Sequence, residues 1–155
     1  MFFKDIIGQT EAKQRLIKEI QEGKIPHARL FCGGQGTGKL PLAIAYARYL
    51  SCEHPGETDA CGNCPNCIKY NKLAHPDLHF AFPVIKQKNK DTVSDDFLTL
   101  WREMLQNTPY FNMNIWLDQM GAENQQAQIF VKESEEIVRK LSLKPSQGGY
   151  KIMII

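Results

Sequence analysis

The feature that most constrains this chain is a glycine-rich segment, residues 33–40, which reads Gly-Gly-Gln-Gly-Thr-Gly-Lys-Leu. Its spacing matches G-x-x-x-x-G-K-[ST], a loop whose glycines turn backbone N–H groups toward a phosphate and whose lysine reaches the β and γ phosphates. Gly33, Gly38 and Lys39 fill their positions, whereas Leu40 stands where a hydroxyl would bind Mg²⁺. Because leucine offers no oxygen to a hard cation, the pattern predicts impaired phosphoryl transfer even where a nucleotide binds.

The residues around this loop have the order that a phosphate-binding loop requires. Apolar residues 30–32 predict a short strand before it, and the alanine-rich residues 39–50 predict a helix after it, with Pro41 tolerated in the first turn. Residues 10–22 predict an earlier helix because its apolar residues share one face. Strand, loop and helix in this order favour an α/β P-loop fold over a glycine-rich turn without function.

Two more strands and a helix are predicted in the second half of the chain. Residues 75–82 and the apolar run 151–155 are typical of buried strands. Residues 129–143 predict a helix with Ile137, Val138 and Leu141 at helical spacing, which is ended by Pro145 and the Gly148-Gly149 pair. Since the chain stops in an apolar run, we expect it to be a fragment of a longer protein.

Residues 83–128 are polar and irregular, and we interpret them as an insertion of unknown role. Ser94 can cap a helix within it, and the apolar residues of that helix fall on one face. They are Phe97, Leu100, Trp101, Met104 and Leu105. Such a stripe is more often a packing face than a groove for a partner.

Composition and charge exclude several classes of protein. The chain has 155 residues, 43% of them hydrophobic and 23% charged, which suits one soluble globular domain. A net charge of +2 is too mild for a protein that binds nucleic acid through a strongly basic face. The charged amino terminus has no apolar h-region, so we expect neither a signal peptide nor a membrane anchor and a cytoplasmic location.

The cysteines predict a structural metal site. Four of the five are Cys52, Cys61, Cys64 and Cys67, and the two-residue gaps let neighbouring thiolates converge on one tetrahedral Zn²⁺. Two disulfides are the alternative, which a reducing cytoplasm disfavours. His54 and His75 are further candidate ligands that a complete set of four cysteines makes unnecessary, and Cys32 is expected to be a small buried hydrophobe.

Taken together, these segments resemble one known family. The carriers are residues 3–9 (Phe-Lys-Asp-Ile-Ile-Gly-Gln), residues 24–31, the glycine loop, the four cysteines, and residues 141–155. They resemble the bacterial clamp-loader subunits of DNA polymerase III, which are AAA+ modules. The resemblance implies a P-loop NTPase fold, a parallel sheet flanked by helices, for residues 1–155 as a single amino-terminal domain. The zinc module 52–67 and the insertion 83–128 lie within it. The resemblance covers residues 1–82 and 129–155 well and the insertion poorly.

The resemblance also implies a nucleotide site. Ile7 and Gly8 would line the adenine pocket, and residues 33–39 would face the phosphates of ATP or ADP, bound weakly or not at all. The phosphate-facing residues are Gly33, Gly34, Gln35, Gly36, Thr37, Gly38 and Lys39. Residues 152–155 would form the strand that precedes the acidic Walker B residues, which are not in this chain. The chain also lacks the family's Ser-Arg-Cys arginine finger, and we expect no catalytic residue in it.

Within that family, Leu40 favours the δ′ type, a stator, over the ATP-driven γ/τ type. The implied function is DNA replication, in which a ring of different subunits loads the sliding clamp onto primed DNA. Two alternatives stay open: an ATP-hydrolysing γ/τ subunit, and a zinc-stabilised P-loop protein that binds nucleic acid outside any clamp loader. The mild charge counts against the second alternative.

Overall fold

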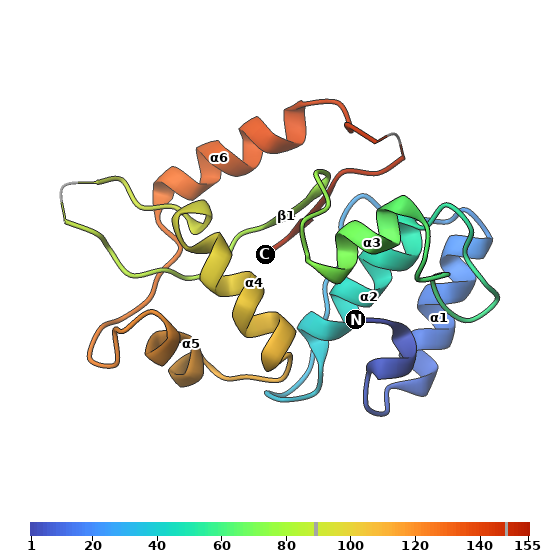
Figure 1. Cartoon of the computed structure of the whole chain (residues 1–155), viewed down its shortest axis with the longest axis horizontal. Helices are drawn as coiled ribbons and strands as arrows, with labels where there is room; N and C mark the ends of the chain where they lie inside the picture. Colours follow the sequence, from blue (N-terminus) through green and yellow to red (C-terminus); the bar gives the residue numbers. More distant parts are fainter. Residues whose placement is uncertain (89, 148) are drawn as a thin grey trace. The chain divides into compact units, whose positions relative to one another are not determined.

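The computed structural model describes residues 1–88, 90–147 and 149–155, which form two compact units, Met1–His75 and Pro76–Ile155. The first contains η1 (Phe3–Asp5), α1 (Thr10–Gln21), α2 (Lys39–Ser51) and α3 (Pro65–Asn71). The second contains β1 (Leu78–Phe80), η2 (Ser94–Phe97), α4 (Leu98–Asn107), α5 (Met113–Gln119), α6 (Val131–Ser142) and β2 (Ile152–Ile154). Figure 1 shows these elements in chain order. No helix in the described ranges combines the length and the apolar character that crossing a membrane requires.

The first unit is built on the packing of α1 against α2. The helices predicted over residues 10–22 and 39–50 are confirmed, and Leu16 is buried while Ile17 and Ile20 pack beside it. The core extends from η1 through both helices to the cysteine segment. Its buried members are Phe3, Ile6, Leu16, Leu42, Ala45, Tyr49, Ala60, Cys64 and Cys67. Two of the four clustered cysteines are therefore part of the apolar core.

The strand predicted over residues 30–32 is not formed. These residues are described, but they adopt no regular ladder, and the side chain of Leu30 is 86% exposed. A strand requires a hydrogen-bonded neighbour, and no segment described in the first unit pairs with residues 30–32. The order of loop and helix is thus confirmed, whereas the strand that would complete the P-loop fold is not.

The second unit contains a small parallel sheet. Strands β1 and β2 pair in parallel, with Leu78 opposite Ile152 and Phe80 opposite Ile154. Both strands were predicted, and both are shorter than the apolar runs that indicated them. Parallel strands require a crossover, and here the connection carries η2, α4, α5 and α6. With this sheet, the chain is a mixed α/β structure.

The segment 83–128 is closed at its ends and packed by aromatic side chains. Val84 and Gln128 form an antiparallel bridge with N···O distances of 2.9 Å in both directions. The ring of Trp101 on α4 stacks on Phe82, the residue just before this segment, with centroids 4.0 Å apart, and it meets Trp116 of α5 edge to face at 5.0 Å. Four residues of the predicted apolar face, Phe97, Trp101, Met104 and Leu105, are buried, and the fifth, Leu100, is partly buried. Helix α5 was not predicted, although Asn112, which accepts a hydrogen bond from the Ile115 amide, is the cap that signals it.

Helix α6 forms where it was predicted, but with a different face buried. Glu133 and Lys140 are 2% and 7% exposed, whereas Val138 is 68% exposed and Leu141 is also exposed. The buried Lys140 ammonium lies 2.7 Å from the Asp95 carboxylate. Ser94 and Asp95 of η2 are the partners that compensate the burial of Glu133 and Lys140. The helical period of residues 129–143 cannot reveal partners from another segment. Of the predicted helix-breaking pair after α6, Gly148 lies outside the described residues.

Ser94 links three segments of the second unit. Its hydroxyl accepts a hydrogen bond from the Phe82 amide at 2.9 Å and donates one to the Phe82 carbonyl at 3.0 Å. Its own amide donates to the Glu133 carboxylate at 2.6 Å. The side chain therefore does not cap a helix, as the sequence predicted, but connects the end of β1 to η2.

We expect Ser94→Ala to destabilise the second unit. The substitution leaves the amide and carbonyl of buried Phe82 without their partner, which costs roughly 1–3 kcal/mol. Urea unfolding followed by tryptophan fluorescence measures the change, because both tryptophans, Trp101 and Trp116, lie in this unit. Ser134→Ala, at an exposed position of α6, is the matched control. Equal unfolding midpoints for the two variants would contradict the role given to Ser94.

Candidate functional site

The glycine loop has the backbone shape that its glycines permit. Gly36 and Gly38 have φ angles of 74° and 81°, in the left-handed region that residues with a Cβ seldom adopt. Gly38 is the residue that precedes the first turn of α2, so the loop leads directly into a helix amino terminus. Residues 33–37 are exposed. The loop therefore presents its backbone to solvent at the end of a helix where an anion is favoured.

Lys39 is folded back onto this loop. Its ammonium donates hydrogen bonds to the Gly33 carbonyl at 2.9 Å and to the Gly34 carbonyl at 2.5 Å. The Thr37 hydroxyl also donates to the Gly34 carbonyl, at 2.9 Å. A phosphate on the loop would have to compete with these carbonyls for the ammonium.

Leu40 follows in the first turn of α2 and is partly buried. Its aliphatic side chain adds no ligand atom beside Lys39. A magnesium ion near the loop would therefore take its ligands from water, from phosphate or from other residues.

Residues 7–9 are tied to the loop by one hydrogen bond. The Gln9 side-chain amide donates to the Thr37 carbonyl at 3.2 Å. Ile7, predicted to line an adenine pocket, is 78% exposed and lies with Gly8 just before α1. The structure thus brings the two parts of the predicted nucleotide site together at Gln9, a residue that the sequence analysis did not select.

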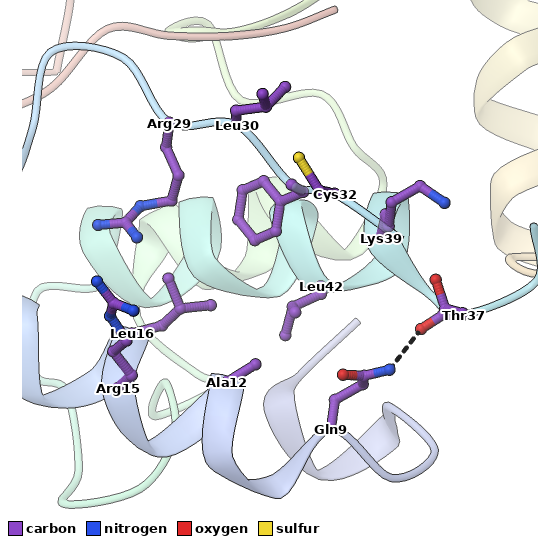
Figure 2. Close-up of a pocket in the computed structure, with 11 residues that line it drawn as sticks. Gln9, Ala12, Arg15, Leu16, Arg29, Leu30, Cys32, Thr37, Lys39 and Leu42 are labelled. Atoms are coloured by element: carbon purple, nitrogen blue, oxygen red, sulfur yellow. Dashed lines mark hydrogen bonds between the residues drawn. The ribbon is translucent and has the colours of Figure 1, made fainter. Parts of the chain in front are cut away.

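A cavity of about 400 Å³ lies beside the loop, between α1 and residues 29–32 (Figure 2). Thr37 and Lys39 stand at one end of it, and Arg15 and Arg29 line the other. Both arginines pair with Glu19, whose single negative charge compensates one of their two positive charges. Cys32 also lines the cavity and is exposed, so the prediction that it is a buried hydrophobe is wrong. Of the residues predicted to face a nucleotide, this cavity includes Thr37 and Lys39.

The four predicted cysteines converge. The sulfur atoms of Cys52, Cys61, Cys64 and Cys67 all lie within 4.8 Å of one another, and the Cys61 and Cys67 sulfurs are 4.0 Å apart. In a tetrahedral zinc site with Zn–S bonds of about 2.3 Å, sulfur atoms are about 3.8 Å apart. The cluster is therefore close to the dimensions that a single metal ion requires.

Backbone amides orient these sulfurs. The amides of Cys61, Cys64 and Cys67 donate to the sulfurs of Cys52, Cys61 and Cys64 at 3.3, 3.4 and 3.4 Å. Cys52 directly follows α2, Cys64 directly precedes α3, and Cys67 lies in the first turn of α3, so two helix termini place three of the four candidate ligands. Such N–H donors stabilise negative sulfur, which is the form that binds a metal. His54 and His75 are not members of the cluster, and the His75 ring is hydrogen-bonded to the Asn66 side chain at 3.1 Å.

The loop between Cys52 and Cys61 is attached to both long helices. The Tyr49 hydroxyl of α2 donates to the Gly56 carbonyl at 2.8 Å, and the side-chain amide of Gln21, on α1, donates to the Glu57 carbonyl at 2.9 Å. The Lys4 amide donates to the Asp59 carboxylate at 3.0 Å. These contacts hold the loop in place around the cluster.

The four thiols are not equivalent in the absence of metal. Backbone amides of Asn63 and then Cys64 lower the pKa of Cys61 to about 6. Burial raises the pKa of Cys52 to about 12 and also raises the pKa of Cys67. In metal-free protein near neutral pH, the Cys61 thiolate is therefore favoured over those of Cys52 and Cys67, and a bound divalent cation would displace the protons of these two.

We expect Cys61 to be the most readily alkylated member of the cluster in reduced, metal-free protein. Its pKa lies below the ordinary value, so its thiolate fraction rises as the pH increases through about 6, whereas Cys52 remains protonated at that pH. Alkylation with iodoacetamide at several pH values, with modified peptides measured by mass spectrometry, tests this. A midpoint for Cys61 near 9 would contradict it.

Comparison with known proteins places these features in a family. The family model described as "DNA polymerase III, delta subunit" matches residues 8–155. The chain is 31% identical over 108 residues to the DNA polymerase III subunit tau/gamma of Haemophilus influenzae, a match that covers 70% of the chain and 14% of that protein. It is 33% identical over 92 residues to subunit delta′ of Bacillus subtilis, covering 57% of the chain and 28% of that protein. It is 35% identical over 65 residues to subunit tau of the same organism, covering 42% and 12%.

The chain therefore spans between about an eighth and a quarter of the length of these relatives. The identities to tau and delta′ subunits are similar, so they do not separate the two types. The family match, in contrast, covers nearly the whole chain, including the glycine loop, the four cysteines and both strands. The resemblance to bacterial clamp-loader subunits is confirmed, and this chain belongs to the DNA polymerase III delta-subunit family.

Proposed function

We propose that this chain is part of the AAA+ module of a δ′-type clamp-loader subunit and that it acts as a stator. The observation that carries the proposal is Leu40. Phosphoryl transfer on a loop of this kind uses a hydroxyl beside the lysine to hold Mg²⁺, which neutralises charge as it develops on the phosphates. An aliphatic side chain cannot take that place, and so the loop is better suited to holding a position than to driving a cycle of hydrolysis.

Nucleotide binding without turnover is compatible with the loop. Its exposed backbone at the start of α2 favours an anion, and Lys39 supplies a positive charge. However, the ammonium already has two carbonyl partners, so a phosphate gains less from it than from an unengaged lysine. ATP or ADP would therefore bind weakly, with Gly33–Lys39 around the phosphates and Ile7 and Gly8 near the base.

The four cysteines would hold a structural zinc ion. Zinc suits a complete set of four sulfur ligands, and a site closed by four protein ligands has no open position for a reacting water. Cys52, Cys61, Cys64 and Cys67 have the required proximity and their sulfurs accept backbone hydrogen bonds. When bound, the ion supplies strong coordination in place of weak contacts, which stabilises the segment between α2 and α3.

The partners that follow from the family are other clamp-loader subunits, the sliding clamp, and primed DNA reached through the assembly. The relatives are subunits of DNA polymerase III, a replicative enzyme, and a subunit that does not hydrolyse ATP would contribute by fixing its neighbours in a ring. We infer a cytoplasmic location because the relatives are bacterial DNA polymerase III subunits.

A second candidate is an ATP-hydrolysing subunit of the γ/τ type. It is favoured by the similarity to tau and tau/gamma proteins, which is as high as the similarity to delta′. In that case a water or another residue would replace the missing hydroxyl at position 40.

Nucleotide binding and turnover by Leu40→Thr separate the two candidates. For a stator, the wild-type protein shows no turnover above background, and Mg²⁺ leaves its nucleotide affinity unchanged. Leu40→Thr restores an oxygen ligand, so Mg²⁺ should then strengthen binding several-fold. Leu40→Val is the matched control, because valine has the shape of threonine without the hydroxyl. Wild-type hydrolysis at a rate that threonine barely improves would assign the protein to the γ/τ type.

Zinc content tests the metal site. We expect one zinc per chain in wild-type protein and less than a tenth of that in Cys61→Ser, because a serine hydroxyl is a poor substitute for thiolate. Cys61 is partly exposed, so the loss reflects the ligand more than core packing. Cys32→Ser is the control, since Cys32 lies outside the cluster. Equal zinc content in the two variants would refute the site.

A further inference from the structure

Arg48 is a buried cation whose hydrogen bonds, within the described structure, go to neutral groups and not to a carboxylate. It lies on α2 and is 1% exposed. Its Nη2 donates to the Cys67 carbonyl at 3.2 Å and to the Asn71 side-chain oxygen at 2.8 Å, and both acceptors are neutral. Nε and Nη1 are buried and have no hydrogen-bond partner among the described residues. A guanidinium in this state is unfavourable unless negative charge lies nearby.

The neighbour of this guanidinium is the cysteine cluster. Besides accepting a hydrogen bond through its carbonyl, Cys67 also faces Arg48 with its thiol. Four thiolates around one divalent ion carry a net charge of −2, because four negative charges exceed two positive ones. Metal binding would therefore place more negative charge beside Arg48 than the metal-free cluster provides, in which only the lowered pKa of Cys61 favours a thiolate.

Phe2 holds the guanidinium against the cluster. Its ring centroid is 3.6 Å from the Arg48 Cζ, which is stacking distance for an arginine on an aromatic face. The same ring covers Gly62, in the turn between Cys61 and Cys64. A Cβ added to Gly62 would approach the Phe2 ring to 3.1 Å, and the φ of 85° also requires glycine there. One aromatic ring thus touches both the cation and the metal-binding turn.

We propose that Arg48 is the charge partner of the four-cysteine metal centre, positioned by Phe2. Arg48 does not bind the metal. It compensates the negative charge of the metal–thiolate complex from the α2 side, and Phe2 excludes water from both groups. The inference rests on the proposed zinc site and adds two residues to it, neither of which the cysteine spacing could indicate. Outer-shell partners of metal ligands typically change metal affinity by 10–100-fold.

The test compares zinc release from wild-type protein and from Arg48→Met, whose side chain has similar length and no charge. Zinc release to a chromogenic chelator should be about 10–100-fold faster in Arg48→Met than in wild type. Arg48→Lys keeps the positive charge but lacks the planar guanidinium that stacks on Phe2, so its release rate should lie between the two. Phe2→Leu should also release zinc faster than the wild-type protein. Arg15→Met, which removes an exposed charge on α1, should leave the rate unchanged.

A second measurement distinguishes charge compensation from simple packing. In metal-free protein, methionine should leave the thermal stability unchanged or higher, because it removes a buried charge without a partner. A purely structural arginine would instead destabilise metal-free and zinc-bound protein alike. That result, or equal zinc release from wild type and Arg48→Met, would overturn the inference while leaving the zinc site intact. Wild-type protein that neither contains zinc nor takes it up after reduction would overturn both.

Discussion

The first unit depends on the meeting of four sulfur atoms at the carboxyl-terminal end of α2. The segment that follows this helix, residues 52–64, contains no helix or strand in its described structure and buries few apolar side chains. Hydrogen bonds from Tyr49 and Gln21 hold it at two carbonyls. Coordination of one ion by all four sulfurs would fix the same path much more strongly. The position of α3 and the docking of η1 near Gly62 both follow from that path.

Helix α2 connects the two candidate sites. Its 13 residues give it a length of about 20 Å, with Lys39 at its first turn and Cys52 just after its last. At that separation a metal ion held by the four cysteines would exert little direct force on a phosphate at the loop. It would act instead on the helix that carries the loop, because Leu42, Ala45 and Tyr49 pack α2 into the core that includes Cys64 and Cys67. A domain that works by position needs this kind of rigidity more than it needs chemistry at the loop.

Local patterns predicted much of this structure. The helices before and after the glycine loop, the two short strand segments and the convergence of the cysteines were all indicated by residues close together in sequence, whereas the pairing of Leu78 with Ile152 joins distant segments. The failures involve partners far apart in the chain. Residues 30–32 lack a neighbouring strand among the described residues. The burial of Glu133 and Lys140 depends on Ser94 and Asp95, about 40 residues earlier, which no helical period can indicate.

Arg48 illustrates the same limit within the metal site. In the sequence it is one basic residue in an alanine-rich helix, and helical periodicity gives no reason to place a cation in the core. Its role can be inferred only from the fold, in which α2 places Arg48 beside Cys67 and the ring of Phe2, near the amino terminus, stacks on its guanidinium. Spacing can therefore identify metal ligands, whereas the groups that compensate their charge require the fold.

The glycine loop shows how a site can keep its shape without its full chemistry. The positive φ angles at positions 36 and 38 explain why glycine occurs there, and hydrogen bonds to the Gly33 and Gly34 carbonyls give Lys39 a structural role in the loop. These features stabilise the loop whether or not a nucleotide binds. A hydroxyl at position 40 would serve Mg²⁺ and is not needed for that shape, so leucine at this position is compatible with the loop's backbone. For the stator proposed above, the glycine loop would therefore contribute its shape, and the loss of the hydroxyl at position 40 would remove a magnesium ligand without altering that shape.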